Sequence, residues 1–155
     1  MMEAEQKMKT SPNLVTSLAT CKCARCRTGK MFKGKMSYNS KKNMDMNEYC
    51  PACGQRMEIE VGFYYGTGYM SYALTVAISV ATFIAYWVLF GVSISDNSLF
   101  IWLGVNIAVL ILMVPYIMRL SRSCWLAIFV MYEKNWREKP AEKPDRIVEE
   151  QMRNW

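Results

Sequence analysis

Histidine is absent from the 155 residues of the chain. Its absence removes the side chain that most often serves as a general base, a haem ligand or the partner of a nucleophilic cysteine. Charge is missing over long stretches as well, because no Asp, Glu, Lys or Arg occurs from Val61 to Ser95 or from Asn97 to Met118. A helix that faces water does not tolerate such runs, so the second half of the chain is not a soluble globular fold.

Two segments have the length and apolar content of membrane-spanning helices. A spanning helix needs about 20 apolar residues, and residues 68–91 and 99–118 each supply roughly that number. We therefore expect a membrane α-helical hairpin over residues 62–118, with the lipid bilayer around it. No continuous apolar run precedes a small-residue cleavage site near the N-terminus, so we expect no removable secretory signal.

The basic residues are distributed asymmetrically. Of the 19 Lys and Arg residues, 11 precede residue 57, none lies between residues 57 and 118, and 8 follow residue 118. The positive-inside rule then places both termini in the cytoplasm and the short connector around Asp96 outside. The net charge of +6 fits basic clusters that face anionic lipid headgroups, which we favour over a nucleic-acid partner.

The strongest chemical pattern is formed by cysteines. Cys23-Ala-Arg-Cys26 is followed after 23 residues by Cys50-Pro-Ala-Cys53. Two residues between thiolates let both sulfurs of a tight turn reach one tetrahedral ion, and the second pair completes the four ligands. Four thiolates leave no position open for water, so we expect one structural zinc per chain in an N-terminal small β zinc ribbon over residues 21–61.

Other interpretations of the cysteines differ in what they require. Disulfides need an oxidising compartment, whereas the distribution of basic residues places these cysteines in the cytoplasm. Thioredoxin-like redox chemistry needs a parallel βαβ unit, and none precedes the spans. A rubredoxin-like iron site uses the same spacing, so iron stays open as an alternative to zinc. Of the remaining cysteines, Cys21 is either a substitute ligand or a free thiol, and Cys124 is a small buried apolar residue.

Small residues recur every four positions in both spans. Small side chains permit close helix contact, so we expect the two rows to form the seam of the hairpin. The rows are Ala73, Ala77, Ala81 and Ala85 in the first span and Gly104 and Ala108 in the second. Hydroxyl residues on another face bond to carbonyls of their own helix or contact a partner subunit, the first being favoured. The amide of Asn106 should find an interhelical hydrogen-bond partner.

An aromatic stripe follows the second span. Pro115 should bend the span near its cytoplasmic end. Beyond it we expect a C-terminal juxtamembrane amphipathic helix over residues 119–136, which lies at the headgroup layer or against a neighbouring protein. Its interface residues are Arg119, Arg122, Trp125, Phe129, Tyr132 and Trp136. We expect a flexible tail over residues 1–20 and a charged tail over residues 137–155.

Together these motifs resemble a known family, the bacterial membrane proteins grouped as domain of unknown function 983. The resemblance rests on the two cysteine pairs with Gly29-Lys-Met-Phe and Gly54, on Gly62-Phe-Tyr-Tyr-Gly66 with Met70-Ser-Tyr-Ala-Leu74, and on Pro115-Tyr116 with Arg119, Arg122 and Trp125. The Gly-Phe-Tyr-Tyr-Gly motif is similar to the Bacteroidota branch. The resemblance implies a zinc ribbon followed by two helices in the bacterial inner (cytoplasmic) membrane, and no established activity. Relatives encoded near assembly factors for haem-copper oxidases imply a respiratory complex by association alone.

These observations favour a noncatalytic inner-membrane adaptor or accessory subunit. Its cytoplasmic zinc ribbon would dock a membrane protein partner or complex, with no nucleic acid and no small-molecule substrate. The alternative is a copper- or metal-handling factor for oxidase assembly, in which Met44 and Met46 assist the cysteines. A third hypothesis, a membrane enzyme, would use residues near the headgroups that form no recognised catalytic set. They are Tyr64, Tyr65, Tyr69, Arg119 and Arg122.

Overall fold

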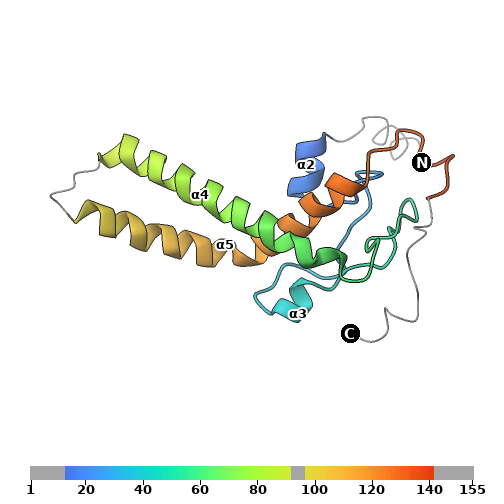
Figure 1. Cartoon of the computed structure of the whole chain (residues 1–155), viewed down its shortest axis with the longest axis horizontal. Coiled ribbons are helices and arrows are strands. Elements are labelled where there is room, and N and C mark those ends of the chain that lie inside the picture. Colours follow the sequence, from blue (N-terminus) through green and yellow to red (C-terminus); the bar gives the residue numbers. More distant parts are fainter. Residues whose placement is uncertain (1–12, 92–96, 142–155) are drawn as a thin grey trace, which may run out of the picture.

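The computed structural model describes residues 13–91 and 97–141 of the chain. In chain order its elements are α2 (Leu14–Ala19), α3 (Ser40–Asn43), the 3-10 helix η1 (Phe63–Gly66), α4 (Thr67–Phe90) and α5 (Ser98–Phe129). Helices α4 and α5 lie side by side as a long hairpin, and the other elements gather at one end of it (Figure 1). The hairpin connector around Asp96 lies largely outside the described residues.

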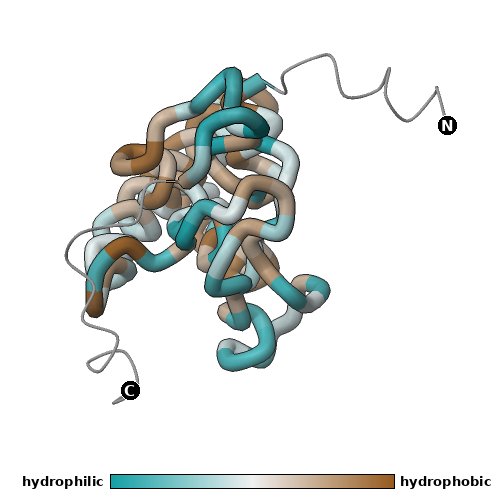
Figure 2. The backbone as a smooth tube through the Cα atoms, turned by 90° about the vertical axis from the view of Figure 1, so that its right-hand side faces the viewer, coloured by the Kyte–Doolittle hydropathy of each residue, from teal (hydrophilic) through white to brown (hydrophobic). Residues whose placement is uncertain are grey.

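The two long helices have the length and the apolar composition of membrane-spanning helices. Residues Phe63–Phe90 and Ser98–Phe129 are both long and apolar enough to cross a membrane. No residue of α4 is buried within the chain, which argues against its being the core helix of a soluble protein. Figure 2 views the chain from the end that carries the cysteines, where several loops of the backbone are formed by hydrophilic residues. The predicted helical hairpin is therefore confirmed.

The contact between α4 and α5 does not use the predicted small-residue rows. All six of these residues are exposed: Ala73, Ala77, Ala81, Ala85, Gly104 and Ala108. A Cβ atom built on Gly104 would meet no atom within 4 Å. The prediction that these rows form the seam is wrong, because larger side chains occupy it. Phe83 and Trp102, for example, pack edge to face with 5.1 Å between ring centroids, an arrangement that aromatic rings favour.

Asn106 supplies the polar contact of the seam. Its Nδ2 donates to the Ser79 hydroxyl at 3.2 Å, and its Oδ1 accepts from the Thr82 hydroxyl at 3.0 Å. The predicted interhelical partner of this amide is thus confirmed. Thr75 donates to the Tyr72 carbonyl of its own helix at 2.8 Å, as favoured for the hydroxyl face. Desolvating the amide without partners would cost free energy, so this face and not the alanine row is turned toward α5.

Replacement of Asn106 by leucine should weaken the hairpin. Leucine has the same number of side-chain heavy atoms and the same branching at Cγ but leaves the Ser79 and Thr82 hydroxyls without their interhelical partner, and such bonds contribute roughly 1 kcal/mol in membrane proteins. The change in stability is measured by denaturing the full chain in detergent while the proximity of α4 to α5 is monitored. Gly104→Ala, which adds a methyl group to an open surface, is the matched control and should be neutral. Equal losses in both variants would contradict the assignment of the seam.

Helix α5 continues past the predicted end of the second span. It runs without interruption through Met118 to Phe129 and contains Pro115. The separate juxtamembrane helix predicted over residues 119–136 is therefore corrected: residues 119–129 are the last part of α5, and the described residues that follow, 130–141, are not helical. Figure 1 shows α5 changing direction between its first and last parts, as expected for a helix with an internal proline.

The predicted N-terminal tail is partly helical. Residues 14–19 form α2, which contacts α5, and Ser17 within it is buried. The Tyr116 hydroxyl donates to the Ala19 carbonyl at 3.1 Å and so ties α2 to α5. The flexible tail predicted for residues 1–20 is corrected for this segment. Residues 1–12 and 142–155, which hold the rest of both predicted tails, lie outside the described part of the chain.

Residues 21–61, called the cysteine domain below, form turns and the short helix α3. Within the described residues the domain has no strand, and its pairings are isolated antiparallel bridges: Lys22 with Lys30, Phe32 with Met46, and Tyr49 with Arg56. The predicted β ribbon thus stays a prediction. A small core of Met31, Met57 and three cysteines extends to Leu126 at the end of α5, so the domain and the hairpin share buried apolar side chains.

Candidate metal centre

Four cysteine sulfurs converge in the cysteine domain. The Sγ atoms of Cys23, Cys26, Cys50 and Cys53 all lie within 4.8 Å of one another. Those of Cys23 and Cys53 are 3.8 Å apart, and those of Cys26 and Cys50 are 3.7 Å apart. A tetrahedral ion bound at about 2.3 Å by four thiolates requires sulfur separations of roughly 3.8 Å. The four residues predicted as ligands are therefore brought together, and they can hold one metal ion.

Each cysteine pair lies on the same kind of turn. The Arg27 amide donates to the Cys23 carbonyl at 2.8 Å, and the Gly54 amide donates to the Cys50 carbonyl at 2.9 Å. Both donors have left-handed backbones, with φ of 57° at Arg27 and 69° at Gly54. Glycine adopts this conformation without strain, whereas an arginine there costs about 1 kcal/mol. Stacking of the Arg27 guanidinium over the Tyr132 ring, 4.1 Å from its centroid, offsets part of that cost.

Gly29 leaves room for the sulfur of the opposite turn. Its amide donates to the Cys26 sulfur at 3.4 Å. A Cβ atom at this position would overlap the Cys50 sulfur and come within 3.3 Å of the Ala52 Cβ. Glycine is thus required by close approach to the metal ligands, and its φ is not in the left-handed range.

Replacement of Gly29 by alanine should therefore displace Cys50 and weaken metal binding. We expect a loss of at least about tenfold in metal affinity, comparable to the loss of a group that supports the ligands of a metal site. Competition with a chromogenic chelator measures it. Gly34→Ala is the matched control, since a Cβ there meets only the Lys42 carbonyl at 3.7 Å, an ordinary contact. Unchanged affinity in Gly29→Ala would show that Cys50 is not a ligand.

The crowded thiols ease ionisation of two of the ligands. Hydrogen bonding from the Cys23 thiol lowers the pKa of Cys26 and that of Cys50, the latter to about 7. Cys21 lies outside the cluster, and burial raises its pKa to about 11. The structure therefore gives no ligand role to Cys21, and Cys124 is likewise a half-buried free thiol outside the cluster.

Arg119 fastens the cysteine domain to α5. Its Nε donates to the Asn43 carbonyl at 3.0 Å, and its Nη2 donates to the carbonyls of Gly34 and Lys35 at 3.0 and 2.9 Å. The guanidinium also lies 4.7 Å from the centroid of the Phe32 ring. Arg119 is only 7% exposed. Its predicted headgroup role is therefore corrected: this arginine is an internal clamp.

Helix α3 docks beside the proline of α5. The buried Asn43 donates from Nδ2 to the Pro115 carbonyl at 2.8 Å, and the Tyr38 hydroxyl donates to the Leu112 carbonyl at 2.9 Å. Because proline lacks an amide hydrogen, it disrupts the regular bonding of this turn. The cysteine domain thus binds α5 where the backbone of the helix is least regular.

A second buried arginine holds the segment after α5. Arg25, which lies between Cys23 and Cys26, donates from Nη2 to the carbonyls of Lys139 and Pro140 at 2.8 and 2.9 Å. Its own carbonyl accepts from the Glu133 amide at 3.1 Å. The segment 130–141 is therefore hydrogen-bonded to the first cysteine turn through Arg25. Arg25 belongs to the basic clusters predicted to face anionic lipid headgroups, and no local pattern distinguishes a buried arginine from an exposed one.

The aromatic stripe makes contacts within the chain, although Trp125, Tyr132 and Trp136 are only half-buried and Phe129 is exposed. The Trp125 Nε1 donates to the Phe63 carbonyl at 2.8 Å, and a Cβ atom on Gly66 would overlap the Trp125 ring. Phe129 packs edge to face on Phe63 with 5.2 Å between centroids while remaining exposed. Trp136 lies against the core of the cysteine domain. The stripe therefore joins the start of the first long helix to the end of the second.

Fold and site together define a class of protein: a helical hairpin long and apolar enough to cross a membrane, with a four-cysteine cluster at one end that can hold a metal ion. Residues 41–130 match the family described as protein of unknown function (DUF983), and the chain belongs to this family. The match includes the second cysteine pair and both long helices but begins after the first pair. Comparison with curated proteins and with solved structures gives no significant match.

Proposed function

We propose that the chain is a noncatalytic adaptor or accessory subunit of the bacterial inner membrane. In this proposal both termini face the cytoplasm, and the cysteine domain is a zinc ribbon that docks a partner protein next to the bilayer. The excess of basic residues on both sides of the hairpin supports this orientation. A partner that is itself a membrane complex, such as a respiratory complex, fits the proposed location.

The observation that best supports this proposal is that four cysteines are available to fill all the ligand positions of one metal ion. Four thiolates saturate a zinc ion, so no position remains at which water or a substrate is activated. Cys23, Cys26 and Cys50 are at most 3% exposed and Cys53 is half-buried, so access of a reactant to the ion is restricted as well. Such a centre stabilises the fold of the domain around it. In this proposal the stabilised surface of the domain recognises a partner and does not turn over a substrate.

Rigid attachment of the domain supports the same function. Arg119 and Asn43 join the cysteine domain to α5, and Arg25 joins it to the segment that follows α5. The docking surface is thereby held in one orientation relative to the spans. The small-residue rows of the hairpin stay exposed within the chain, and small residues allow another membrane helix to approach closely.

Photo-crosslinking in living cells tests the proposal. A crosslinking residue at Met36, which is 51% exposed in the cysteine domain, should capture one specific protein in wild-type cells. The same capture should be lost when Cys50 is also replaced by serine, since the surface then loses its metal. A crosslinking residue at exposed Val88 of α4, far along the hairpin, is the positional control. Gentle purification from native membranes that always yields the chain alone would contradict the proposal.

The copper-handling alternative gains no comparable support. The Met46 sulfur accepts a hydrogen bond from Arg122 Nη1 at 3.2 Å, so a copper(I) ion would approach it against the charge of the guanidinium. Soft thioether ligands need an accessible lone pair free of such competition. We therefore place the metal at the four cysteines alone and expect bound zinc that copper(I) does not exchange.

A further inference from the structure

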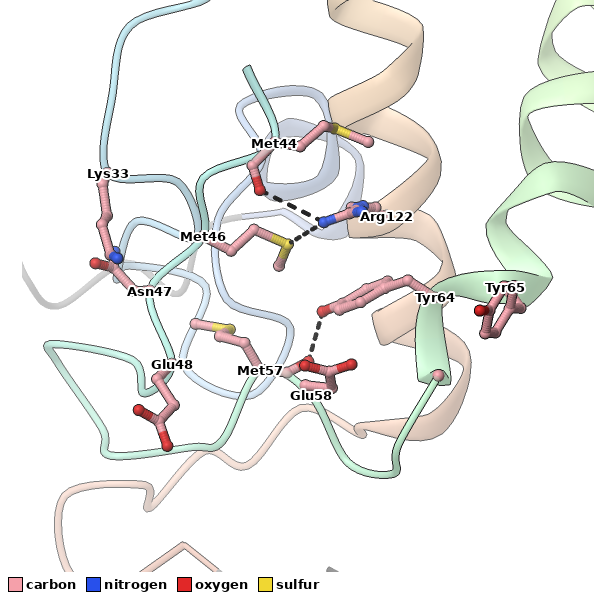
Figure 3. A pocket seen from close by; sticks show the side chains of 11 residues that line it. Lys33, Met44, Met46, Asn47, Glu48, Met57, Glu58, Tyr64, Tyr65 and Arg122 are labelled. Carbon is pink, nitrogen blue, oxygen red and sulfur yellow. Dashed lines mark hydrogen bonds between the residues drawn. The ribbon is translucent and has the colours of Figure 1, made fainter. Parts of the chain in front are cut away.

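A cavity lined by both polar and apolar side chains lies where the cysteine domain meets η1 and α5. Its volume is about 520 Å³, within the range of small-molecule pockets. It is bounded by the loop that carries Met44 and Met46, by η1 with Tyr64, and by Arg122 of α5 (Figure 3). The cavity therefore opens beside the ends of the spans and is separate from the four-cysteine cluster.

Arg122 has hydrogen-bond donors to spare in this cavity. Its Nη1 reaches only weak or distant acceptors, the Met46 sulfur at 3.2 Å and the Met44 carbonyl at 3.5 Å. Its Nε is buried without a hydrogen-bond partner, and no ion pair within the described residues includes it. Arg119, one turn earlier, has three carbonyl acceptors at 2.9 to 3.0 Å. A half-buried guanidinium with unused donors favours an anion.

The other end of the cavity is acidic. Glu48 and Glu58 line it, and Figure 3 draws the Tyr64 ring between Glu58 and Arg122. Arg122 stacks over this ring at 4.8 Å. Glu48 lies 3.8 Å from an Arg56 nitrogen, whereas no ion pair of the described residues includes Glu58. The cavity thus holds Arg122 on one side of the Tyr64 ring and Glu58 on the other. Lys33, which also lines it, pairs with Asp45 at 3.0 Å.

We propose that this cavity binds the headgroup of a phospholipid that carries both a phosphate and an ammonium. The phosphate accepts paired hydrogen bonds from the planar fork of the Arg122 guanidinium, and the ammonium lies toward Glu58. The lipid as source rests on the proposed membrane crossing, which puts headgroups level with the ends of the spans. The anion chemistry of Arg122 does not depend on it.

Titration calorimetry of the metal-loaded full chain in an uncharged detergent tests this. The probes are dihexanoyl phosphatidylethanolamine, dihexanoyl phosphatidylglycerol, dihexanoyl glycerol and inorganic phosphate. We expect saturable binding of the phosphatidylethanolamine (the ethanolamine lipid) and weaker binding of the phosphatidylglycerol (the glycerol phospholipid). Dihexanoyl glycerol, which has no phosphate, should not bind. Arg122→Gln should weaken ethanolamine-lipid binding at least about tenfold, and Glu58→Gln should abolish its advantage over the glycerol phospholipid. Lys41→Gln, the same charge change at an exposed residue outside the cavity, should have no effect.

Equal losses in Arg122→Gln and Lys41→Gln would overturn the site and indicate unspecific charge attraction. Tighter binding of inorganic phosphate than of either lipid, with the same dependence on Arg122, would overturn the lipid and leave the anion site. Arg122→Lys keeps the charge without the fork, so an unchanged affinity in a folded Arg122→Lys variant would also overturn the assignment. Phosphate binding through Arg122 in a chain that proves soluble without detergent would refute the membrane proposal and support the anion site.

Discussion

Replacement of Cys50 by serine is expected to abolish metal binding and unfold the cysteine domain while the hairpin remains helical. The domain buries few apolar side chains of its own, so we expect metal binding to supply much of its folding free energy; structural zinc contributes about 10–16 kcal/mol in zinc-finger peptides. Cys50 is 3% exposed and its sulfur faces that of Cys26. Limited proteolysis should then cut within residues 21–61, and metal analysis should find no stoichiometric ion.

Cys21→Ser is the matched control for this experiment. Cys21 is a free thiol two residues from a ligand but lies outside the cluster. The substitution should preserve one ion per chain and the protease-resistant domain. Retention of a stoichiometric, tightly held ion by Cys50→Ser, or loss of the ion from Cys21→Ser, would show that the ligand set is different.

The second large effect is expected at Arg119. Methionine in its place fills much of the volume but leaves the carbonyls of Asn43, Gly34 and Lys35 without their donor. Hydrogen bonds to a charged group contribute about 1.5–3 kcal/mol each, so we expect a destabilisation on the order of 3 kcal/mol or more. Hydrogen exchange should accelerate over residues 34–43 and leave the middle of α4 and α5 protected.

Arg122→Met provides the comparison on the same helix. Arg122 donates only to the Met46 sulfur and to a carbonyl at 3.5 Å, so its replacement should accelerate exchange over residues 34–43 much less than that of Arg119. The cysteine cluster should keep its ion in both variants, because neither arginine touches a ligand sulfur. Equal effects of the two substitutions would show that the clamp is not specific to Arg119.

The hairpin and the ligand set were predictable because each rests on a local pattern. A run of about 20 residues without charge limits a segment to few environments, whatever the rest of the chain does. In the same way, two residues between cysteines place both sulfurs on one turn, and Gly54 indicates the left-handed residue that closes it. The family match over residues 41–130 agrees with the resemblance inferred from these motifs.

The seam of the hairpin and the role of the buried arginines were not predictable in this way. Helical spacing shows that the alanines from Ala73 to Ala85 share a face, but it does not show which face meets the other helix. The need of the Asn106 amide for partners decides that. Arg119 and Arg25 bind carbonyls of irregular segments 76 to 115 residues away in the chain. Backbone carbonyls are present at every residue, so no residue type marks such a partner.

At the end of the hairpin, we propose, four cysteine sulfurs hold one ion. X-ray absorption at the zinc edge, combined with metal analysis of the purified full chain, tests it most directly. We predict one zinc per chain with four sulfur neighbours at about 2.3 Å. A chain that purifies folded without a bound transition metal, or a metal with nitrogen or oxygen ligands in place of any of the four sulfurs, would contradict it.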